Sequence, residues 1–267
     1  MDATDLMTDK VYFVSPEESV ARVKNLFLKH KISSVLVMKD DEPVGLVGES
    51  DLADAFFQAR EPIDEVRVKK VMRKGIVKVT PEATPKEISK ELLEKKVKSA
   101  IVFDEQVLGI VTKTDLLDYF INNFQGRVMV HEVMDKNIRK VKPMHSLFHA
   151  IRLMQEEGIS RVLVEDNTLQ GIISLKDVAF ASPGTHPTKR ILKSEKTGDR
   201  EVHILPFTVQ DVMKTEVKTI SSKDSAANAA KIMLKEKIGS LVVTNQDNQI
   251  EGIITKTDIT KYLSKTD

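Results

Sequence analysis

One octapeptide occurs four times in this 267-residue chain, and it constrains the fold more than any other feature. Each copy reads glycine, two apolar residues, a hydroxyl residue, two variable residues, aspartate and an apolar residue. The first copy carries Gly48 in the hydroxyl position. The copies span residues 45–52, 109–116, 171–178 and 252–259. Internal repetition at such a spacing predicts an array of similar structural units.

Each octapeptide closes a unit with the same order of predicted elements. In the second unit, residues 77–80 form a strand that Pro81 stops, and Ile88 and Leu92 mark the apolar side of a helix. Two further strands, at 99–103 and 108–111, lead into a helix that begins within the octapeptide. All four units therefore read β-α-β-β-α, which predicts an α/β (α+β) fold of mixed sheets with helices on one side.

The units are too short to bury a sufficient core alone, so we expect them to pair. We predict repeats at 1–60, 61–124, 125–181 and 209–267, and an inserted basic linker at 182–208. Pairing consecutive repeats gives two modules, 1–124 and 125–267.

The composition excludes several classes of function. The chain has 41 basic and 40 acidic residues, so no net field favours nucleic acid, and it has no cysteine for disulfides, thiol catalysis or metal binding. No apolar run approaches the ~18 residues of a membrane span, and residues 1–5 lack the features of a signal peptide, so a cytoplasmic protein is expected. No phosphate-binding loop, nucleophile elbow or dinucleotide fingerprint occurs, which predicts a protein that is not an enzyme.

The octapeptide has two interpretations. A hydroxyl followed three residues later by an acid is a capping box, which Thr112 and Asp115 would form. The same arrangement suits a nucleotide, because a helix start offers free N–H groups to phosphate and an aspartate accepts from vicinal hydroxyls. Both interpretations remain open from the residues alone.

The full pattern resembles the cystathionine-β-synthase (CBS) domain. It consists of Val-Met, a strand ending near proline, a helix, a serine-led strand, and the Gly-apolar-apolar-Thr-x-x-Asp motif, over nearly the whole chain. The resemblance implies two pseudo-twofold repeat pairs, called Bateman modules, with clefts that commonly bind adenosine compounds. Four repeats in one chain resemble the gamma-type regulatory subunit of AMP-activated protein kinase and stand-alone archaeal CBS proteins.

The resemblance also implies binding residues, because the aspartate of one repeat meets the ribose while the partner repeat holds the adenine. The implied pairings are Ser174 and Asp177 facing Thr219, Ile220, Gly239 and Ser240; Thr255 and Asp258 facing Lys140, Val141, Ser160 and Arg161; Thr112 and Asp115 facing Phe13, Val14, Ser33 and Ser34; and Asp51 facing Lys78, Val79, Ser99 and Ala100. Asp177 has the most complete set. The Asp51 cleft lacks the hydroxyl, so we expect it to be empty or weak.

The expected ligand is AMP, ADP or ATP, with no catalytic cofactor, and the expected partner is a regulated protein such as a kinase, transporter or enzyme. Module stacking into a disk implies a monomer or a homodimer. One alternative is S-adenosylmethionine or methylthioadenosine as the ligand. Another is a nucleic-acid or protein adaptor that acts through the basic insertion at 182–208.

Two further residue sets are weighed against binding roles. His145 and His149 stand four apart on a predicted helix among expected core residues Leu147, Phe148 and Ala150, but a catalytic zinc needs three protein ligands, so no metal is expected. A methionine opens each unit, at positions 7, 72, 134 and 213, and is interpreted as a packing residue.

Overall fold

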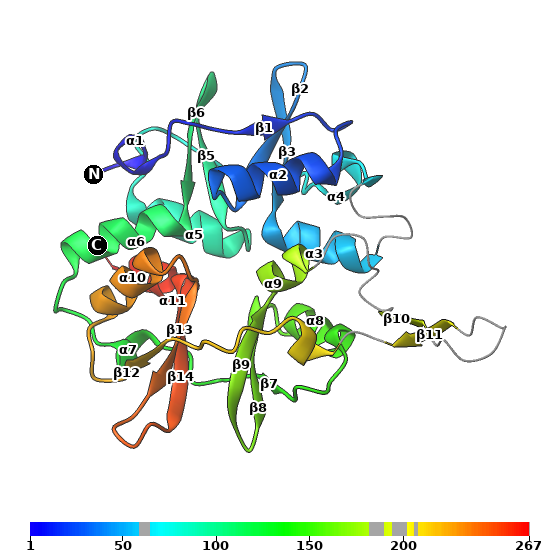
Figure 1. Ribbon diagram of the computed structural model, residues 1–267. Helices are drawn as coiled ribbons and strands as arrows, with labels where there is room; N and C mark the ends of the chain where they lie inside the picture. The colour runs from blue at the N-terminus through cyan, green and yellow to red at the C-terminus, as the bar shows by residue number, and fades with distance from the viewer. Residues whose placement is uncertain (59–64, 182–189, 194–201, 206–207, 267) are drawn as a thin grey trace. The chain divides into compact units, whose positions relative to one another are not determined.

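The computed structural model describes residues 1–58, 65–181, 190–193, 202–205 and 208–266 (Figure 1). Four three-stranded sheets repeat one topology, in which the first two strands are parallel and the last two antiparallel. Their strands are β1 (Phe13–Val14), β2 (Ser34–Lys39) and β3 (Glu42–Gly48); β4 (Lys78–Val79), β5 (Ser99–Asp104) and β6 (Gln106–Thr112); β7 (Lys140–Val141), β8 (Arg161–Asp166) and β9 (Thr168–Ser174); and β12 (Thr219–Ser221), β13 (Ser240–Thr244) and β14 (Ile250–Thr255). The predicted β-α-β-β-α order and mixed sheets are confirmed.

Two helices accompany each sheet. One connects the parallel strands: α2 (Val20–His30), α5 (Pro85–Glu94), α8 (Leu147–Glu156) and α10 (Ala226–Lys235). The other follows the third strand: α3 (Glu49–Gln58), α6 (Lys113–Asn123), α9 (Leu175–Phe180) and α11 (Lys256–Leu263). Short helices that the sequence did not predict precede the repeats: α1 (Ala3–Leu6), α4 (Val68–Val71), α7 (Val130–Val133) and the 3-10 turn η2 (Val209–Asp211).

Helix α5 shows why these segments are helical. Thr84 accepts from the Glu87 N–H, and the Glu87 carboxylate accepts from the Thr84 N–H, so a capping box fixes the start, with proline in the first turn. Ile88 and Leu92 are completely buried one turn apart. Lys96, just past the end of the helix, adopts the left-handed conformation at φ 54° that stops it.

The chain divides into two compact units that are not continuous in sequence. Unit 1 contains residues 1–11, 75–138 and 217–267, hence the sheets and helices of repeats 2 and 4. Unit 2 contains residues 12–74 and 139–216, hence those of repeats 1 and 3. In unit 1, α6 packs against α10 and α11; in unit 2, α3 packs against α9 (Figure 1). Each unit has its own apolar core.

The first residues of each repeat, which we call its leading segment, pack on the other repeat of the consecutive pair. Thr8 exchanges both backbone hydrogen bonds with Ile110 of repeat 2, and Arg73 does the same with Leu46 of repeat 1. Asp135 bonds to Ile253 of repeat 4, and Lys214 to Ile172 of repeat 3. We call Thr8, Arg73, Asp135 and Lys214 the bridge residues. These backbone bridges link repeat 1 with repeat 2, and repeat 3 with repeat 4. The sequence predicts the same pairs as modules, and the division of the chain into those modules stays a prediction.

Much of the basic linker predicted at 182–208 lies outside the described residues. What is described there is an antiparallel hairpin of β10 (Arg190–Lys193) and β11 (Val202–Leu205). In the part of the chain that the structure describes, no helix is both long and apolar enough to cross a membrane.

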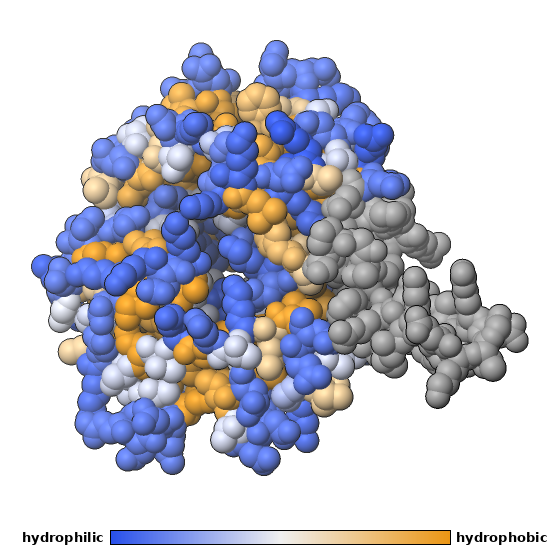
Figure 2. All heavy atoms as spheres, viewed as in Figure 1, coloured by the Kyte–Doolittle hydropathy of each residue, from blue (hydrophilic) through white to orange (hydrophobic). Residues whose placement is uncertain are grey.

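One core prediction is wrong. Phe148 is 50% exposed, whereas Leu147 and Ala150 are buried, because the apolar side of α8 follows Leu147, Ala150, Ile151 and Met154. In the view of Figure 2, hydrophilic side chains cover most of the visible described surface, with smaller apolar patches between them.

Candidate functional site

The four motif aspartates, Asp51, Asp115, Asp177 and Asp258, all occupy the same place at the start of a helix. One carboxylate oxygen, Oδ2, accepts the backbone N–H of the residue three positions earlier at 2.6 to 3.0 Å. In repeats 2, 3 and 4 the same oxygen also accepts the hydroxyl of Thr112, Ser174 or Thr255. Gly48 lacks the hydroxyl, yet its N–H holds Asp51 in the same way. The capping interpretation is therefore confirmed, with aspartate as effective as glutamate in the third position.

The helix-start amides are largely occupied. The first-turn N–H of Lys113 donates to the Lys98 carbonyl, and those of Leu175 and Lys256 donate to Ser160 and Gly239. The cap hydroxyls accept further amides, such as Thr114 N–H on Thr112 at 3.0 Å. Most of the first-turn N–H groups that the sequence suggested for phosphate are thus already bonded in these three repeats.

The second carboxylate oxygen distinguishes the four sites. In unit 2, Oδ1 of Asp51 forms an ion pair with Arg73 Nε, and Oδ1 of Asp177 lies 3.1 Å from Lys214 Nζ. Both cations are bridge residues. In unit 1, Asp258 Oδ1 lies 3.2 Å from Lys261, on its own helix. Asp115 has no cation within 4.0 Å among the described residues.

Burial changes the acidity of two of these groups. Burial raises the pKa of Asp115, while its hydrogen bonds from Thr112 act in the opposite direction. Burial likewise raises the pKa of Asp51, against the effect of the Arg73 guanidinium. Removing a carboxylate from water disfavours its charged form. Asp115 is therefore a partly buried acid whose Oδ1 has no charge partner among the described residues, and an ordinary helix cap does not require this.

Unit 1 brings two copies of the motif together across α6 and α11. Lys113 Nζ donates to Thr257 Oγ1 at 3.1 Å, and Lys256 Nζ donates to Thr114 Oγ1 at 2.8 Å. In unit 2 the corresponding positions make an ion pair instead, between Glu49 and Lys176 at 3.0 Å. The two units thus differ in the residues beside their aspartates.

The remaining predicted binding residues lie where the sequence placed them within each repeat. Residues Val14, Val79, Val141 and Ile220 are buried in the first strands, and Phe13, Lys78, Lys140 and Thr219 are exposed beside them. The second strands begin at or beside Ser33, Ser34, Ser99, Ala100, Ser160, Arg161, Gly239 and Ser240. The first residue of each second strand pairs with the cap residue of its own repeat, as Arg161 does with Ser174 and Ser240 with Thr255. The clefts predicted between repeats would join residues of different units, and they stay a prediction.

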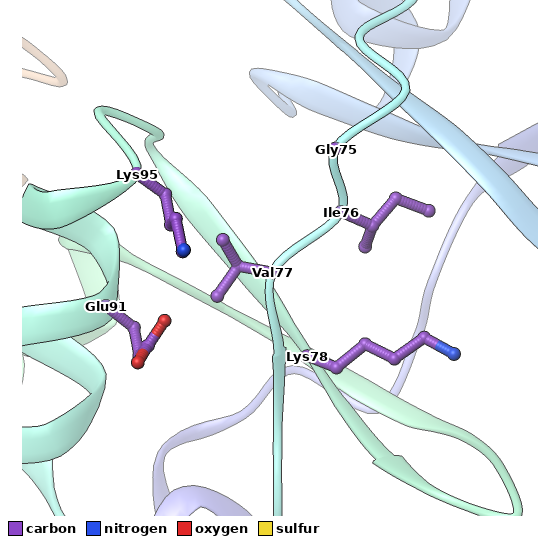
Figure 3. Close-up of a pocket in the computed structure, with 6 residues that line it drawn as sticks. All are labelled: Gly75, Ile76, Val77, Lys78, Glu91 and Lys95. Carbon is purple, nitrogen blue, oxygen red and sulfur yellow. The ribbon is translucent and has the colours of Figure 1, made fainter.

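A cavity of about 430 Å³ lies beside the β4 end of unit 1. It is lined by Gly75, Ile76, Val77, Lys78, Glu91 and Lys95. Figure 3 shows Val77 directed toward Glu91 of α5 and Lys95, which follows the helix, with Ile76 and Lys78 on the other side of the strand. The Lys78 ammonium lies 3.7 Å from the centre of the Phe103 ring. Lys78 is the only lining residue that belongs to the predicted binding set, so this cavity is separate from the motif aspartates.

The histidine pair does not form a recognisable metal centre. The rings of His145 and His149 meet edge to face, with centroids 4.7 Å apart. Among the described residues, no group of three or more His, Cys, Asp or Glu side chains is placed to hold an ion.

The recurring methionine of one repeat packs against the recurring glycine of another. A Cβ on Gly109 would lie 2.5 Å from Met7 Sδ and 3.0 Å from the Thr8 carbonyl oxygen. The same methionine–glycine contact recurs in the other three repeats. The packing role of the methionines is confirmed, and the glycine is needed for close approach of the leading segment.

Sequence reasoning missed the bridge residues. Their positions were visible as the residue after each recurring methionine, and two of the four are cations. The sequence did not show the backbone bridges. Each bridge pairs one of these residues with a residue of another repeat that lies five positions before the motif aspartate.

Comparison with known proteins agrees with this architecture. The family model described as the CBS domain matches residues 3–58, 68–122, 130–184 and 209–265. A Thermofilum pendens protein, an uncharacterized 33.4 kDa protein in a ribosomal RNA operon, is 30% identical over 185 residues, or 67% of this chain. The chain spans 59% of that protein's length. Protein MJ1225 of Methanocaldococcus jannaschii is 26% identical over 207 residues, which cover 74% of this chain and 70% of MJ1225.

Solved structures show the same fold across the whole chain. The crystal structure of MJ1225, proposed as an archaeal homologue of γ-AMPK, superposes with a TM-score of 0.81 at 21% identity, covering 98% of this chain and 99% of that one. An uncharacterized conserved protein from Pyrococcus horikoshii superposes with a TM-score of 0.65 at 17% identity, covering 98% and 100%. With four matched repeats, each of one β-α-β-β-α unit, this chain belongs to the family of CBS-domain proteins.

Proposed function

We propose that this chain is a non-catalytic regulatory protein that binds AMP, ADP or ATP at its motif aspartates and transmits their occupancy to a partner protein. CBS-domain proteins are often regulators that bind nucleotides or other adenosine ligands. The relation of MJ1225 to γ-AMPK supports a nucleotide as the ligand class.

One observation carries the proposal. Each motif aspartate uses Oδ2 to cap a helix and leaves Oδ1 to other partners, as in Asp177 with Lys214 and Asp115 with none described. A carboxylate oxygen held rigidly in this way is a suitable acceptor for ribose hydroxyls. The partly buried Asp115 would regain, from a ribose diol, hydrogen bonds that it lost with water.

Regulation requires that the ligand bind two states of the protein unequally, since a ligand of equal affinity shifts no equilibrium. Arg73 and Lys214 belong to segments that join one repeat to the next, and they touch the aspartates directly. A ligand at Asp51 or Asp177 would therefore act on the connection between repeats.

Isothermal titration with AMP, ADP, ATP and S-adenosylmethionine tests the proposal. We expect at least one nucleotide to bind and Asp177→Ala to weaken its binding, at a stability cost of about 1 kcal/mol for the lost cap. Asp118→Ala, an exposed acid of α6, is the control. If none of the four ligands binds with a Kd below about 1 mM, the sensor role is rejected; if only S-adenosylmethionine binds, the ligand class is wrong.

A further inference from the structure

The bridge residues differ in charge between the two units. In unit 2 they are Arg73 and Lys214. Arg73, which pairs with the Leu46 backbone, contacts Asp51, and Lys214, which pairs with the Ile172 backbone, contacts Asp177. In unit 1 the same position holds Thr8 and Asp135. The Asp135 carboxylate accepts from the Asn137 N–H at 2.8 Å, so it caps its own turn.

The two cations keep donors for a ligand. Arg73 uses Nε on Asp51 and Nη2 on Ser50 Oγ at 3.1 Å, out of five guanidinium N–H groups. The ion pair of Lys214 with Asp177 involves one of three ammonium N–H groups. The side chains of Arg73 and Lys214 remain 40% and 60% exposed, whereas their aspartates are 7% and 9% exposed. Each pair therefore presents a fixed acceptor beside an accessible cation.

An adenosine ligand held at the aspartate would place its 5′ group near that cation. The ribose hydroxyls and the 5′ carbon are substituents of one five-membered ring, so a cation in contact with the carboxylate is within reach of a 5′-phosphate. In repeat 3 the first-turn amide of Leu175 and that of Asp177 are already hydrogen-bonded, so a phosphate there depends on side-chain donors. The motif lysines of unit 1, Lys113 and Lys256, instead donate across to the opposite helix.

We propose that the bridge residue sets the phosphate preference of each motif aspartate. Arg73 and Lys214 make the Asp51 and Asp177 sites selective for 5′-phosphorylated adenosine ligands. The Asp115 site, where the bridge residue is Thr8, has no such selectivity, and at Asp258 the neighbouring cation is Lys261 of its own helix instead of a bridge residue. This inference rests on the proposed function, because it assumes that adenosine ligands bind at these aspartates. It also assigns the Asp51 site a ligand class despite its missing hydroxyl.

The test compares adenosine with AMP, which share the ribose diol and differ only in the phosphate. The full-length chain with Asp115→Asn and Asp258→Asn serves as background, since asparagine keeps an oxygen acceptor for the cap and leaves the unit 2 aspartates. In this background, Arg73→Thr plus Lys214→Thr should lower the ratio of AMP affinity to adenosine affinity about tenfold. Arg73→Lys with Lys214→Arg should retain the ratio, and Lys74→Thr with Lys223→Thr, two exposed lysines, is the charge-matched control.

The reverse background, Asp51→Asn with Asp177→Asn and Asp258→Asn, leaves Asp115, the motif aspartate on the repeat that Thr8 bridges. There, Thr8→Lys should raise the AMP-to-adenosine ratio about tenfold. Circular dichroism of each variant confirms that it is folded before titration. An unchanged ratio in both backgrounds overturns the inference while leaving the proposed function intact, and so does a ratio that responds to Lys113→Thr and Lys256→Thr but not to the bridge residues. If neither adenosine nor AMP binds the unaltered chain, the inference fails with the proposed function.

Discussion

At the scale of single residues, the repeated glycine is a contact residue. The sequence identified the four glycines as a recurring feature but not the atoms that they contact. The structure instead places Gly109 within β6, where the Met7 side chain and the Thr8 backbone of the leading segment press against it. No sequence pattern within one repeat can show this, because the contacting atoms come from a segment about a hundred residues earlier.

Replacing Gly109 with alanine tests this contact. The added Cβ would overlap Met7 and the Thr8 carbonyl, so we expect Gly109→Ala to lower the free energy of unfolding by about 1–3 kcal/mol. Gly75→Ala is the matched control, since no atom lies within 4 Å of the added Cβ. Chemical denaturation of the two variants provides the comparison, and equal stabilities would contradict the packing argument.

Asp115 supplies a pH-dependent prediction. Burial raises its pKa above the ordinary value of 3.8, so the folded state is favoured by protonation of this carboxyl. Its contribution to stability is fully present below pH 3.8 and is lost as the pH rises through the raised folded-state pKa. Asp115→Asn removes this dependence.

Ligand-free Asp115→Asn should therefore gain stability relative to the parent chain as the pH is raised from 3.5 to 7. Thermal unfolding across this pH series measures the difference. Asp104→Asn, an exposed aspartate at the end of β5, controls for the loss of one negative charge. A stability difference that stays constant with pH would show that burial of the carboxylate has no energetic cost.

At the scale of elements, the sequence predicted helices and sheets well and helix boundaries less well. Apolar spacing located α5 correctly, because Ile88 and Leu92 lie on one buried face. In repeat 1 the apolar residues Leu52, Ala55 and Phe56 predict a helix that starts at Leu52. Helix α3 instead begins three residues earlier, at Glu49, because the cap is formed by Gly48 and Asp51. The short leading helices, such as α4, carried no long period that could identify them.

Three connecting helices end in a left-handed lysine. Lys31, Lys96 and Lys237 have φ between 54° and 56°, whereas the third repeat uses Gly158 at φ 63°. A side chain in this conformation costs about 1–2 kcal/mol, partly offset by the greater flexibility of unfolded glycine.

Lys96→Gly should accordingly raise the free energy of unfolding by about 0.5–1 kcal/mol, and Gly158→Lys should lower it by a similar amount. Midpoints of urea denaturation measure both changes. Lys95→Gly, one residue earlier in the right-handed conformation, is expected to destabilise. Stabilisation by Lys95→Gly as well would show that φ is not the cause.

At the scale of the whole molecule, the sequence predicted four repeats and their fold, and the family match agrees. It also predicted which aspartates begin the final helices. It did not predict that the compact units would combine repeats 1 and 3, and repeats 2 and 4. The packing of α3 on α9 depends on tertiary contacts between apolar helix faces. Because these faces are similar in all four repeats, the sequence does not show which two repeats pack together.

The exchange of leading segments predicts an effect at a distance in sequence. Deleting residues 1–8 removes Ala3 and Met7 from the core of unit 1 and the Thr8 hydrogen bonds from Ile110. Hydrogen exchange should accelerate in β6 of repeat 2, whereas β2 and β3 of repeat 1 should keep their protection. Thr4→Ala, an exposed position in α1, should leave both regions unchanged. Loss of protection confined to repeat 1 would contradict the exchange.

The exchange of leading segments also determines when these contacts can form during synthesis of the chain. Thr8 leaves the ribosome long before its backbone partner Ile110 exists. At about 5–20 residues per second, the leading segment waits roughly 5 to 20 s for the strand that will bind it. During that interval Met7 has no glycine to pack against, and repeat 1 has no Arg73 beside Asp51 until the next leading segment is made. The backbone bridges of the first two repeats therefore form only after residues of both repeats have been made.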